Sequence, residues 1–235
     1  MRSFRFAQSV AITFVVLLAQ PTPGRAQVTL GQVDNFGTGT QNWTQGASSP
    51  AGAVSIQNGG PAGATDPFLQ IVANGGTAGG KLVVFNQSQW RGNYNTAGVG
   101  AIEMDLKNLS GPTLSVRIGF KDVSNAGYAS TNGFSLAADG QWHHAVFRLD
   151  SSSLSPVGIP PTLSQVLSNA AELRILHAAG PALNGDTIVA TLGIDNIRAS
   201  PVPEPTGILV LGAGAGVGGW WVRRRTRCNN EMPTG

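Results

Sequence analysis

The segment from position 101 to position 121 constrains the fold most, because apolar and polar residues alternate in it twice. Apolar side chains stand at positions 102, 104 and 106, and charged ones stand at 103, 105 and 107. Positions 114, 116, 118 and 120 are again apolar, and the residues that follow each of them are small or basic. A period of two predicts two half-buried β-strands, each with one face towards solvent. No long segment of the chain shows the helical period instead.

Further short segments of the same kind are separated by Asn-Gly and Asp-Gly dipeptides, which favour turns. One short helix is expected at Leu163–Ala170, with Thr162 as its N-cap. Strands flanking Asp139-Gly140 are expected to pair as a hairpin, and the glycine-rich stretches 46–63 and 74–80 are interpreted as loops. The additional strands are expected at Val28–Val33, Val54–Gln57, Phe68–Ala73, Leu82–Phe85, Phe134–Ala137, Trp142–Leu149, Leu173–His177 and Thr187–Ile197.

About ten short strands with almost no helix predict an all-β domain, an antiparallel β-sandwich, over residues 27–200. Hydrophobic residues make up 41% of the chain, which argues against disorder. A single cysteine, Cys228, excludes an intrachain disulfide framework and any metal site built from several cysteines.

The net charge of +3 belongs to the two ends of the chain rather than to the domain. Seven of the 15 basic residues lie in the first 26 and the last 13 positions. Eight basic residues and ten acids remain between Gln27 and Ser200, a net charge of −2. A nucleic-acid-binding groove needs basic residues concentrated on the folded domain, so no nucleic-acid partner is expected.

The first 26 residues have the order of a secretory signal peptide. Two arginines precede the ten-residue apolar run Val10–Ala19, and small residues stand at −3 and −1 of a cleavage site after Ala26. The run is too short to span a bilayer, which needs about 20 residues. We therefore expect residues 1–26 to be removed on export. A buried N-terminal strand or helix is the alternative.

The C-terminal end is expected to enter a membrane. Gly207–Val222 is an apolar segment of 16 residues, which as a helix is about 24 Å long. Snorkelling of flanking arginines and bilayer thinning compensate for this short length. The cluster Arg223, Arg224, Arg225 and Arg227 is expected to stay cytoplasmic, followed by a short tail, residues 228–235.

Val202, Pro203, Glu204 and Pro205, followed by this helix and the arginines, resemble a PEP-CTERM sorting signal over residues 201–227. The resemblance implies that a membrane protease-transferase, exosortase, recognises and cuts this end. It also implies export to the surface or extracellular matrix of a Gram-negative bacterium, after transient anchoring in the inner membrane. Such bacteria often make exopolysaccharide, which makes exopolysaccharide a candidate partner.

The domain itself resembles carbohydrate-binding modules with a jelly-roll fold. The resemblance lies in Asp34-Asn35-Phe36 near its start, Gly140-Gln141-Trp142 before a late strand, and Ile194-Asp195-Asn196-Ile197 in its closing strand. Members of the resembled families hold a structural calcium ion where the first and last strands meet. The resemblance therefore implies a calcium site at Asp34 and Asp195. Turn or cap aspartates are the alternative interpretation.

The loop from Trp90 to Asn95 is the most ligand-like segment of the domain. Sugar C–H faces stack on aromatic rings, so Trp90 and Tyr94 are candidate platforms, and Arg91 and Asn93 are candidate partners of sugar hydroxyls. Core packing explains Trp142 and another candidate ring, Trp43, at least as well.

No recognisable catalytic motif occurs in the sequence. We therefore predict a non-catalytic surface or matrix protein whose sandwich binds polysaccharide. A secreted polysaccharide lyase or glycoside hydrolase is one alternative, although its two carboxylates cannot be placed from sequence. A structural matrix component without a small ligand is another.

Overall fold

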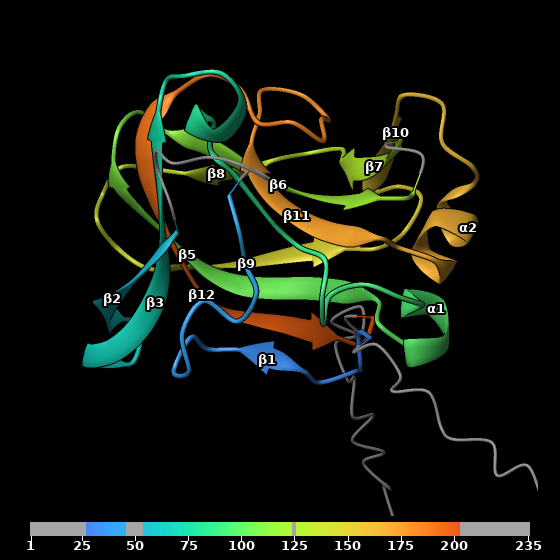
Figure 1. The fold of residues 1–235 in the computed structure, drawn as a ribbon, viewed down its shortest axis with the longest axis horizontal. Coiled ribbons are helices and arrows are strands. Elements are labelled where there is room, and N and C mark those ends of the chain that lie inside the picture. The colour runs from blue at the N-terminus through green and yellow to red at the C-terminus, as the bar shows by residue number, and fades with distance from the viewer. Residues whose placement is uncertain (1–26, 46–53, 124–125, 203–235) are drawn as a thin grey trace, which may run out of the picture. The chain divides into compact units, whose positions relative to one another are not determined.

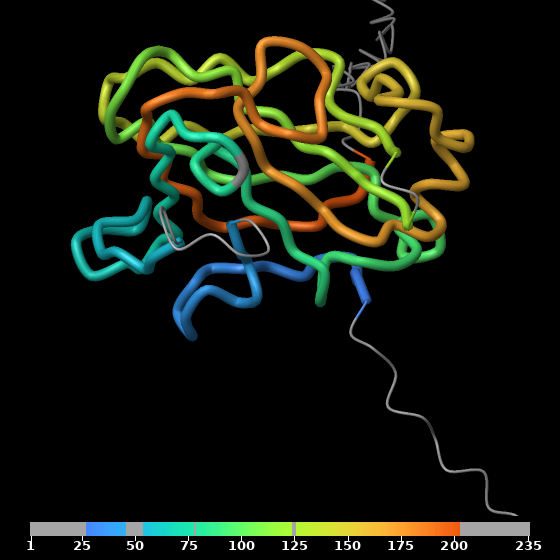
Figure 2. Tube along the Cα trace, turned by 45° about the horizontal axis from the view of Figure 1, so that its top comes forward, coloured from blue at the N-terminus to red at the C-terminus, as the bar shows by residue number. Residues whose placement is uncertain are grey.

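The computed structural model describes residues 27–45, 54–123 and 126–202, which form two antiparallel β-sheets packed face to face. The first sheet has the order β2-β3-β12-β5-β9, with β1 also paired to β12. The second has the order β10-β7-β6-β11-β4, with β8 also paired to β6. Figures 1 and 2 show the two layers and the β2–β3 hairpin that projects from one side. The strands of the first sheet are β1 (Val33–Asp34), β2 (Ser55–Gly60), β3 (Gly63–Asn74), β5 (Ala101–Ser110), β9 (His143–Arg148) and β12 (Val189–Ser200). Those of the second are β4 (Val83–Asn86), β6 (Leu114–Lys121), β7 (Gly127–Ser130), β8 (Phe134–Leu136), β10 (Leu154–Val157) and β11 (Glu172–His177).

The predicted antiparallel sandwich is confirmed, and the chain crosses repeatedly between the sheets, as in the jelly-roll class. Both strongly alternating segments form strands, β5 in the first sheet and β6 in the second. Their apolar positions face each other across the core, and the side chains of Met104, Leu106, Ile118 and Phe120 are fully buried. The hydrophobic period of two therefore determined which face of each strand is buried.

The predicted hairpin around Asp139-Gly140 is wrong. The strand before this turn, β8, pairs with β6 in the second sheet, whereas the strand after it, β9, pairs with β5 in the first. The turn therefore carries the chain from one sheet to the other. Local turn chemistry is the same in both cases, so only the packing of the two sheets distinguishes them.

A β-bulge in β12 decides which way its polar residues face. Asp195 lies opposite Asp105 of β5 and Arg198 lies opposite Glu103, so three steps along β12 match two along β5. The extra residue is Asn196, whose φ is 50°. Asparagine tolerates this left-handed conformation better than most residues, and one extra residue reverses the alternation beyond it.

The helices are short. The predicted helix is confirmed as α2 (Leu163–Ser168), and Thr162 caps it in a capping box with Gln165. A single turn, α1 (Tyr94–Ala97), is capped by Asn93, and a 3₁₀ turn η1 spans Ala78–Gly80. The structure also adds two strands that the sequence did not indicate, β7 and β10. The first strand, β1, shares only Val33 with the predicted strand Val28–Val33.

Several predictions fall outside the described residues. These are the signal peptide (1–26), the sorting motif from Pro203 to Pro205, the helix 207–222, the arginine cluster and the tail 228–235. Val202 is the last described residue. Among the described residues, no helix has the length and apolar character needed to cross a membrane.

Candidate functional site

The aromatic platform expected in the loop after β4 is wrong. The side chains of Trp90 and Tyr94 are fully buried, so neither ring is available to stack on a sugar. The Tyr94 hydroxyl donates to the Trp90 carbonyl at 2.7 Å, and its ring packs edge-on against Phe120. Asn93 uses its side chain to cap α1 by accepting from the Thr96 amide. These residues close one end of the core instead of presenting a ligand loop.

Asp34 is a buried acceptor for three side-chain donors. Its Oδ2 accepts hydrogen bonds from Trp43 Nε1 at 2.7 Å, Trp90 Nε1 at 2.6 Å and Gln89 Nε2 at 3.0 Å. Burial raises the pKa of the Asp34 carboxyl, and these three hydrogen bonds oppose the increase. Asp34 therefore joins the first strand to the two largest side chains of the core.

The outward face of the first sheet carries polar and charged side chains in register across β12, β5 and β9. One row runs from Val33 through Arg198 and Glu103 to Val146, whose backbones are direct partners. The next row runs from Asp195 through Asp105 to His144. We call this surface, together with Lys107 and Trp142, the β5–β9 face. The list of its members is Val33, Glu103, Asp105, Lys107, Trp142, His144, Val146, Asp195 and Arg198.

Trp142 lies on this face rather than in the core. Its half-buried ring packs edge-on against Phe68 at 5.2 Å between centroids, and its Nε1 donates to the Gly59 carbonyl at 3.1 Å. Lys107 Nζ lies 5.8 Å from the ring centroid. The ring reaches over Gly193, where an added Cβ would stand 3.1 Å from Trp142 Cη2. A glycine at this position therefore lets the indole lie close to the sheet.

Elsewhere on the β5–β9 face, a hollow of about 240 Å³ is lined by residues of both rows. His144 Nδ1 lies 3.0 Å from Asp105 Oδ1, and its Nε2 lies 3.6 Å from Glu103 Oε2. Asn196 Nδ2 donates to Asp105 Oδ2 at 2.8 Å. Arg198 is exposed at the rim. Carboxylate, imidazole, carboxamide and guanidinium groups side by side can donate to and accept from ligand hydroxyls.

Asp195 is the most perturbed carboxyl of the described residues. Its side chain is 1% exposed, and its Oδ2 has no hydrogen-bond partner apart from the neighbouring carboxyl of Asp66. The β2–β3 hairpin covers the pair, since a Cβ on Gly60 would clash with Asp66 Oδ2 and lie 3.1 Å from Asp195 Oδ2. Burial, with the nearby charges of Asp66 and Asp105, raises the pKa of Asp195 to about 7.

The structure does not bring Asp34 and Asp195 together. Asp34 pairs with Ile197, which faces the core, whereas Asp195 pairs with Asp105 on the outward face. The prediction that Asp34 and Asp195 share a calcium ion is therefore wrong, because the bulge at Asn196 places their side chains on opposite sides of the sheet. The Asp34 oxygen is also surrounded by N–H donors, which repel a cation. Among the described residues, no three His, Cys, Asp or Glu side chains gather as metal ligands.

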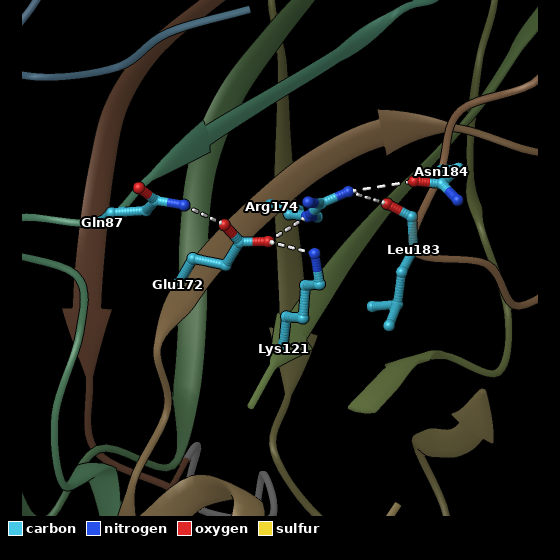
Figure 3. A network of polar contacts seen from close by, with 6 residues as sticks. All are labelled: Gln87, Lys121, Glu172, Arg174, Leu183 and Asn184. Atoms are coloured by element: carbon cyan, nitrogen blue, oxygen red, sulfur yellow. Dashed lines mark hydrogen bonds and ion pairs between the residues drawn. The ribbon is translucent and has the colours of Figure 1, made fainter. Parts of the chain in front are cut away.

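The outward face of the second sheet is occupied by the protein's own charged groups (Figure 3). Glu172 accepts from Arg174 Nε and from Gln87 Nε2, the latter at 2.7 Å. Lys121 Nζ lies 3.7 Å from the same carboxylate. Because Glu172 is nearly inaccessible and faces three donors, the hydrogen-bonding capacity of these groups is used within the protein.

A loop following β11, residues 178–187, covers this second outward face. Arg174 Nη1 donates to the Leu183 carbonyl at 2.6 Å and to Asn184 Oδ1 at 3.2 Å, as Figure 3 shows. The Leu183 side chain approaches Gly119, where an added Cβ would lie 2.9 Å from Leu183 Cδ2. The β5–β9 face is therefore the more accessible of the two outward faces for a ligand.

Sequence reasoning missed the position of Trp142 and the partnership of Asp66 with Asp195. A signal for the first existed, because Trp142 has the same parity as the outward residue His144 in the alternating segment. No sequence signal placed Asp66 beside Asp195, since 129 positions separate them and β3 and β12 were not known to pair.

No protein-family model matches the chain, and no curated protein matches it. Part of an exo-β-agarase is similar over 74% of this chain, with 13% identity and a TM-score of 0.50. This chain spans only 25% of that enzyme's length. A family 11 carbohydrate-binding module from Clostridium thermocellum, solved with a β-1,3-1,4-mixed-linked tetrasaccharide, is similar over 75% of this chain and 99% of the module, with 14% identity and a TM-score of 0.46.

A cellulose-binding domain from Cellulomonas fimi β-1,4-glucanase C is similar over 74% of this chain and 95% of that domain, with 12% identity and a TM-score of 0.38. At these identities the comparison with the agarase segment concerns the fold alone, and it agrees with the β-sandwich described above. Function has to be argued from the residues, because one sandwich fold serves many roles.

Proposed function

We propose that the domain is a non-catalytic, polysaccharide-binding β-sandwich, and that the β5–β9 face is its binding surface. The observation that supports this most is the half-buried ring of Trp142 on the same face as a hollow lined by hydrogen-bonding side chains. An aromatic ring offers a surface on which sugar C–H groups can pack, and polar groups nearby can form hydrogen bonds with the sugar hydroxyls.

Replacing Trp142 with alanine is expected to weaken polysaccharide binding by about thirtyfold or more, because an aromatic anchor buried by the ligand contributes about 2 kcal/mol or more at an interface. Affinity electrophoresis of the purified protein in gels that contain candidate polysaccharides measures this effect. Trp142→Phe is the matched variant: it keeps a ring but loses the hydrogen bond to Gly59. It should retain most of the binding. Equal binding by Trp142→Ala and the unaltered protein, both still folded, would place the ligand elsewhere.

A polysaccharide lyase or hydrolase remains the competing function, favoured by the carboxylates Glu103 and Asp105 in the hollow. The pair Asp66 and Asp195 is a poor candidate, because the hairpin covers it. Activity screens on the same polysaccharides separate the two functions. Turnover that disappears in Glu103→Gln or Asp105→Asn would replace the non-catalytic proposal. Absence of both binding and turnover would favour a purely structural matrix component.

We also propose export and sorting of the whole chain. The signal peptide directs residues 27–235 out of the cytoplasm, and exosortase recognises Val202–Pro205 beside the apolar helix. The prolines bias Val202 and Glu204 towards extended backbone, which a protease cleft can accept. Mass spectrometry of the mature protein from its host should give a C-terminus near position 204. A C-terminus at Gly235 in cells with active exosortase would leave this end as a simple anchor.

We propose a calcium site at Asp195 and Asp66 instead of the predicted pair Asp34 and Asp195. A cation at Asp195 would be held together with Asp66, because Asp195 Oδ2 is buried and lacks another partner. Backbone carbonyl oxygens or water would have to complete the coordination, since calcium takes six to eight oxygen ligands. Its contribution there would be structural, holding the β2–β3 hairpin against the sheet.

A further inference from the structure

We propose that a polar hollow between the loops 38–42 and 88–89 is a second ligand site, which binds an uncharged polyhydroxylated ring such as a neutral sugar residue. The hollow has a volume of about 610 Å³, within the usual range for small-molecule sites. Its lining contains hydroxyl and carboxamide side chains and no charged or aromatic group. The lining residues are Thr38, Thr40, Gln41, Asn42, Ser88 and Gln89.

The floor of this hollow is rigid because Gln89 ties it to the core. Gln89 Nε2 donates to the buried Asp34 at 3.0 Å and to the Gln41 carbonyl at 2.6 Å. Its Oε1 accepts from Asn42 Nδ2 at 3.2 Å. The Gln41 carbonyl also accepts from Asn86 Nδ2 at 2.9 Å. Side chains held in this way lose little further freedom when a ligand binds.

The backbone of this loop is held in an unfavourable conformation. Gln41 and Asn42 are consecutive non-glycine residues with positive φ, at 47° and 62°, and Phe36 has a φ of 58°. Such residues persist only where surrounding contacts enforce them, and they gather at ligand sites. Here the hydrogen bond from the Phe36 amide to Gln41 Oε1, at 2.9 Å, joins two of the three.

Around the rigid floor, several polar groups have no partner within the described part of the chain. The hydroxyls of Thr38, Thr40 and Ser88 make no hydrogen bond there, and Gln41 Nε2 has none either. Each hydroxyl can both donate and accept, and the carboxamide donates. A ring bearing several hydroxyls matches such a set, because sugar hydroxyls also donate and accept.

The lack of basic side chains in the lining of this hollow disfavours acidic ligands. The buried carboxyl of Asp34 is linked to the hollow through Gln89, which donates to it. No basic side chain lines the site, so a uronate or sulfate would be unpaired there. The inference does not rest on the proposed function, because the two loops lie outside the β5–β9 face. Without an aromatic wall the affinity should be low, with a Kd of about 1–10 mM.

The test is a titration of the full-length protein with methyl β-glucopyranoside and methyl β-galactopyranoside, followed by ¹H–¹⁵N NMR. We expect saturable shifts, confined to residues 38–42 and 88–89, that include the side-chain amides of Gln41 and Asn42. The double variant Thr38→Val/Thr40→Val removes two hydroxyls at constant shape and should weaken binding about tenfold. Thr77→Val, at an exposed threonine elsewhere, is the control and should bind normally.

Trp142→Ala should leave these shifts unchanged, which separates this site from the β5–β9 face. Two results would overturn the inference. One is the absence of localised shifts with either sugar at about 50 mM, well above the expected Kd. The other is an equal response from the Thr38→Val/Thr40→Val variant. Competition by galacturonate as strong as that by the neutral sugars would contradict the proposed preference for uncharged ligands.

Discussion

Replacing Asp34 with alanine is expected to lower the free energy of unfolding by about 3–5 kcal/mol, because buried donors lose their acceptor. Trp43 and Trp90 are fully buried, and both direct their indole N–H to Asp34 Oδ2. Each buried donor without a partner costs about 1–3 kcal/mol, and Gln89 loses a partner as well. Since domains of this size unfold with about 5–15 kcal/mol, a large part of the stability would be lost.

Urea unfolding followed by tryptophan fluorescence measures this loss. Asp34→Asn is the matched variant, because its carbonyl oxygen still accepts from the two indoles and it should lose clearly less stability than Asp34→Ala. Ser151→Ala, at an exposed position between β9 and β10, should change stability by about 0.5 kcal/mol or less. A loss below about 1 kcal/mol for Asp34→Ala would mean that the indoles find other acceptors.

The second large effect is a dependence of stability on pH that arises from Asp195. Its pKa is about 7 in the folded protein, against an ordinary value of 3.8. Below pH 3.8 both states hold the proton. Between pH 3.8 and 7 the unfolded chain releases it while the folded protein keeps it, so stability falls as the pH rises. Above pH 7 the loss is complete, at about 4 kcal/mol.

Asp195→Asn removes this titration, because the amide is neutral at every pH and can donate to Asp66. In buffer with a chelator, we expect the variant to match the unaltered protein near pH 4 and to exceed its stability at pH 8. His177 has the opposite effect on the pH dependence of stability. Burial lowers its pKa in the folded protein, so the unfolded chain binds a proton more readily and stability falls as the pH drops below 6.5. The difference between the two proteins, measured by thermal melting at each pH, isolates the contribution of Asp195.

The same measurement tests the calcium proposal. Calcium added at pH 8 should raise the melting temperature of the unaltered protein and leave Asp195→Asn unaffected, because ligand binding stabilises only the folded state that holds the site. No response to calcium, with the pH dependence intact, would leave a pair of carboxyls that share a proton. Parallel pH profiles for the two proteins would show that Asp195 ionises normally.

The features of the site that depend on neighbouring residues in the sequence could be predicted, and those that depend on distant residues could not. The alternation of β5 placed Glu103 and Asp105 on the outward face, and Thr162 was recognised as the N-cap of α2. The loop at Trp90 looked suited to a ligand because aromatic and polar residues are interleaved there. Burial of the Trp90 ring depends on Asp34, 56 positions earlier, which supplies the acceptor that lets the indole enter the core.

Two properties were therefore determined by the sequence itself: an all-β sandwich, and the inward or outward direction of side chains within each regular strand. Both follow from the period of two, which any antiparallel strand must obey. The tertiary structure alone decided where that period breaks and which distant strands meet. Asp195 faces outward towards Asp66, whereas Ile197, two residues later, faces the core. The bulge at Asn196 causes this difference, because one extra residue reverses the alternation, and the bulge is seen only in the pairing of β12 with β5.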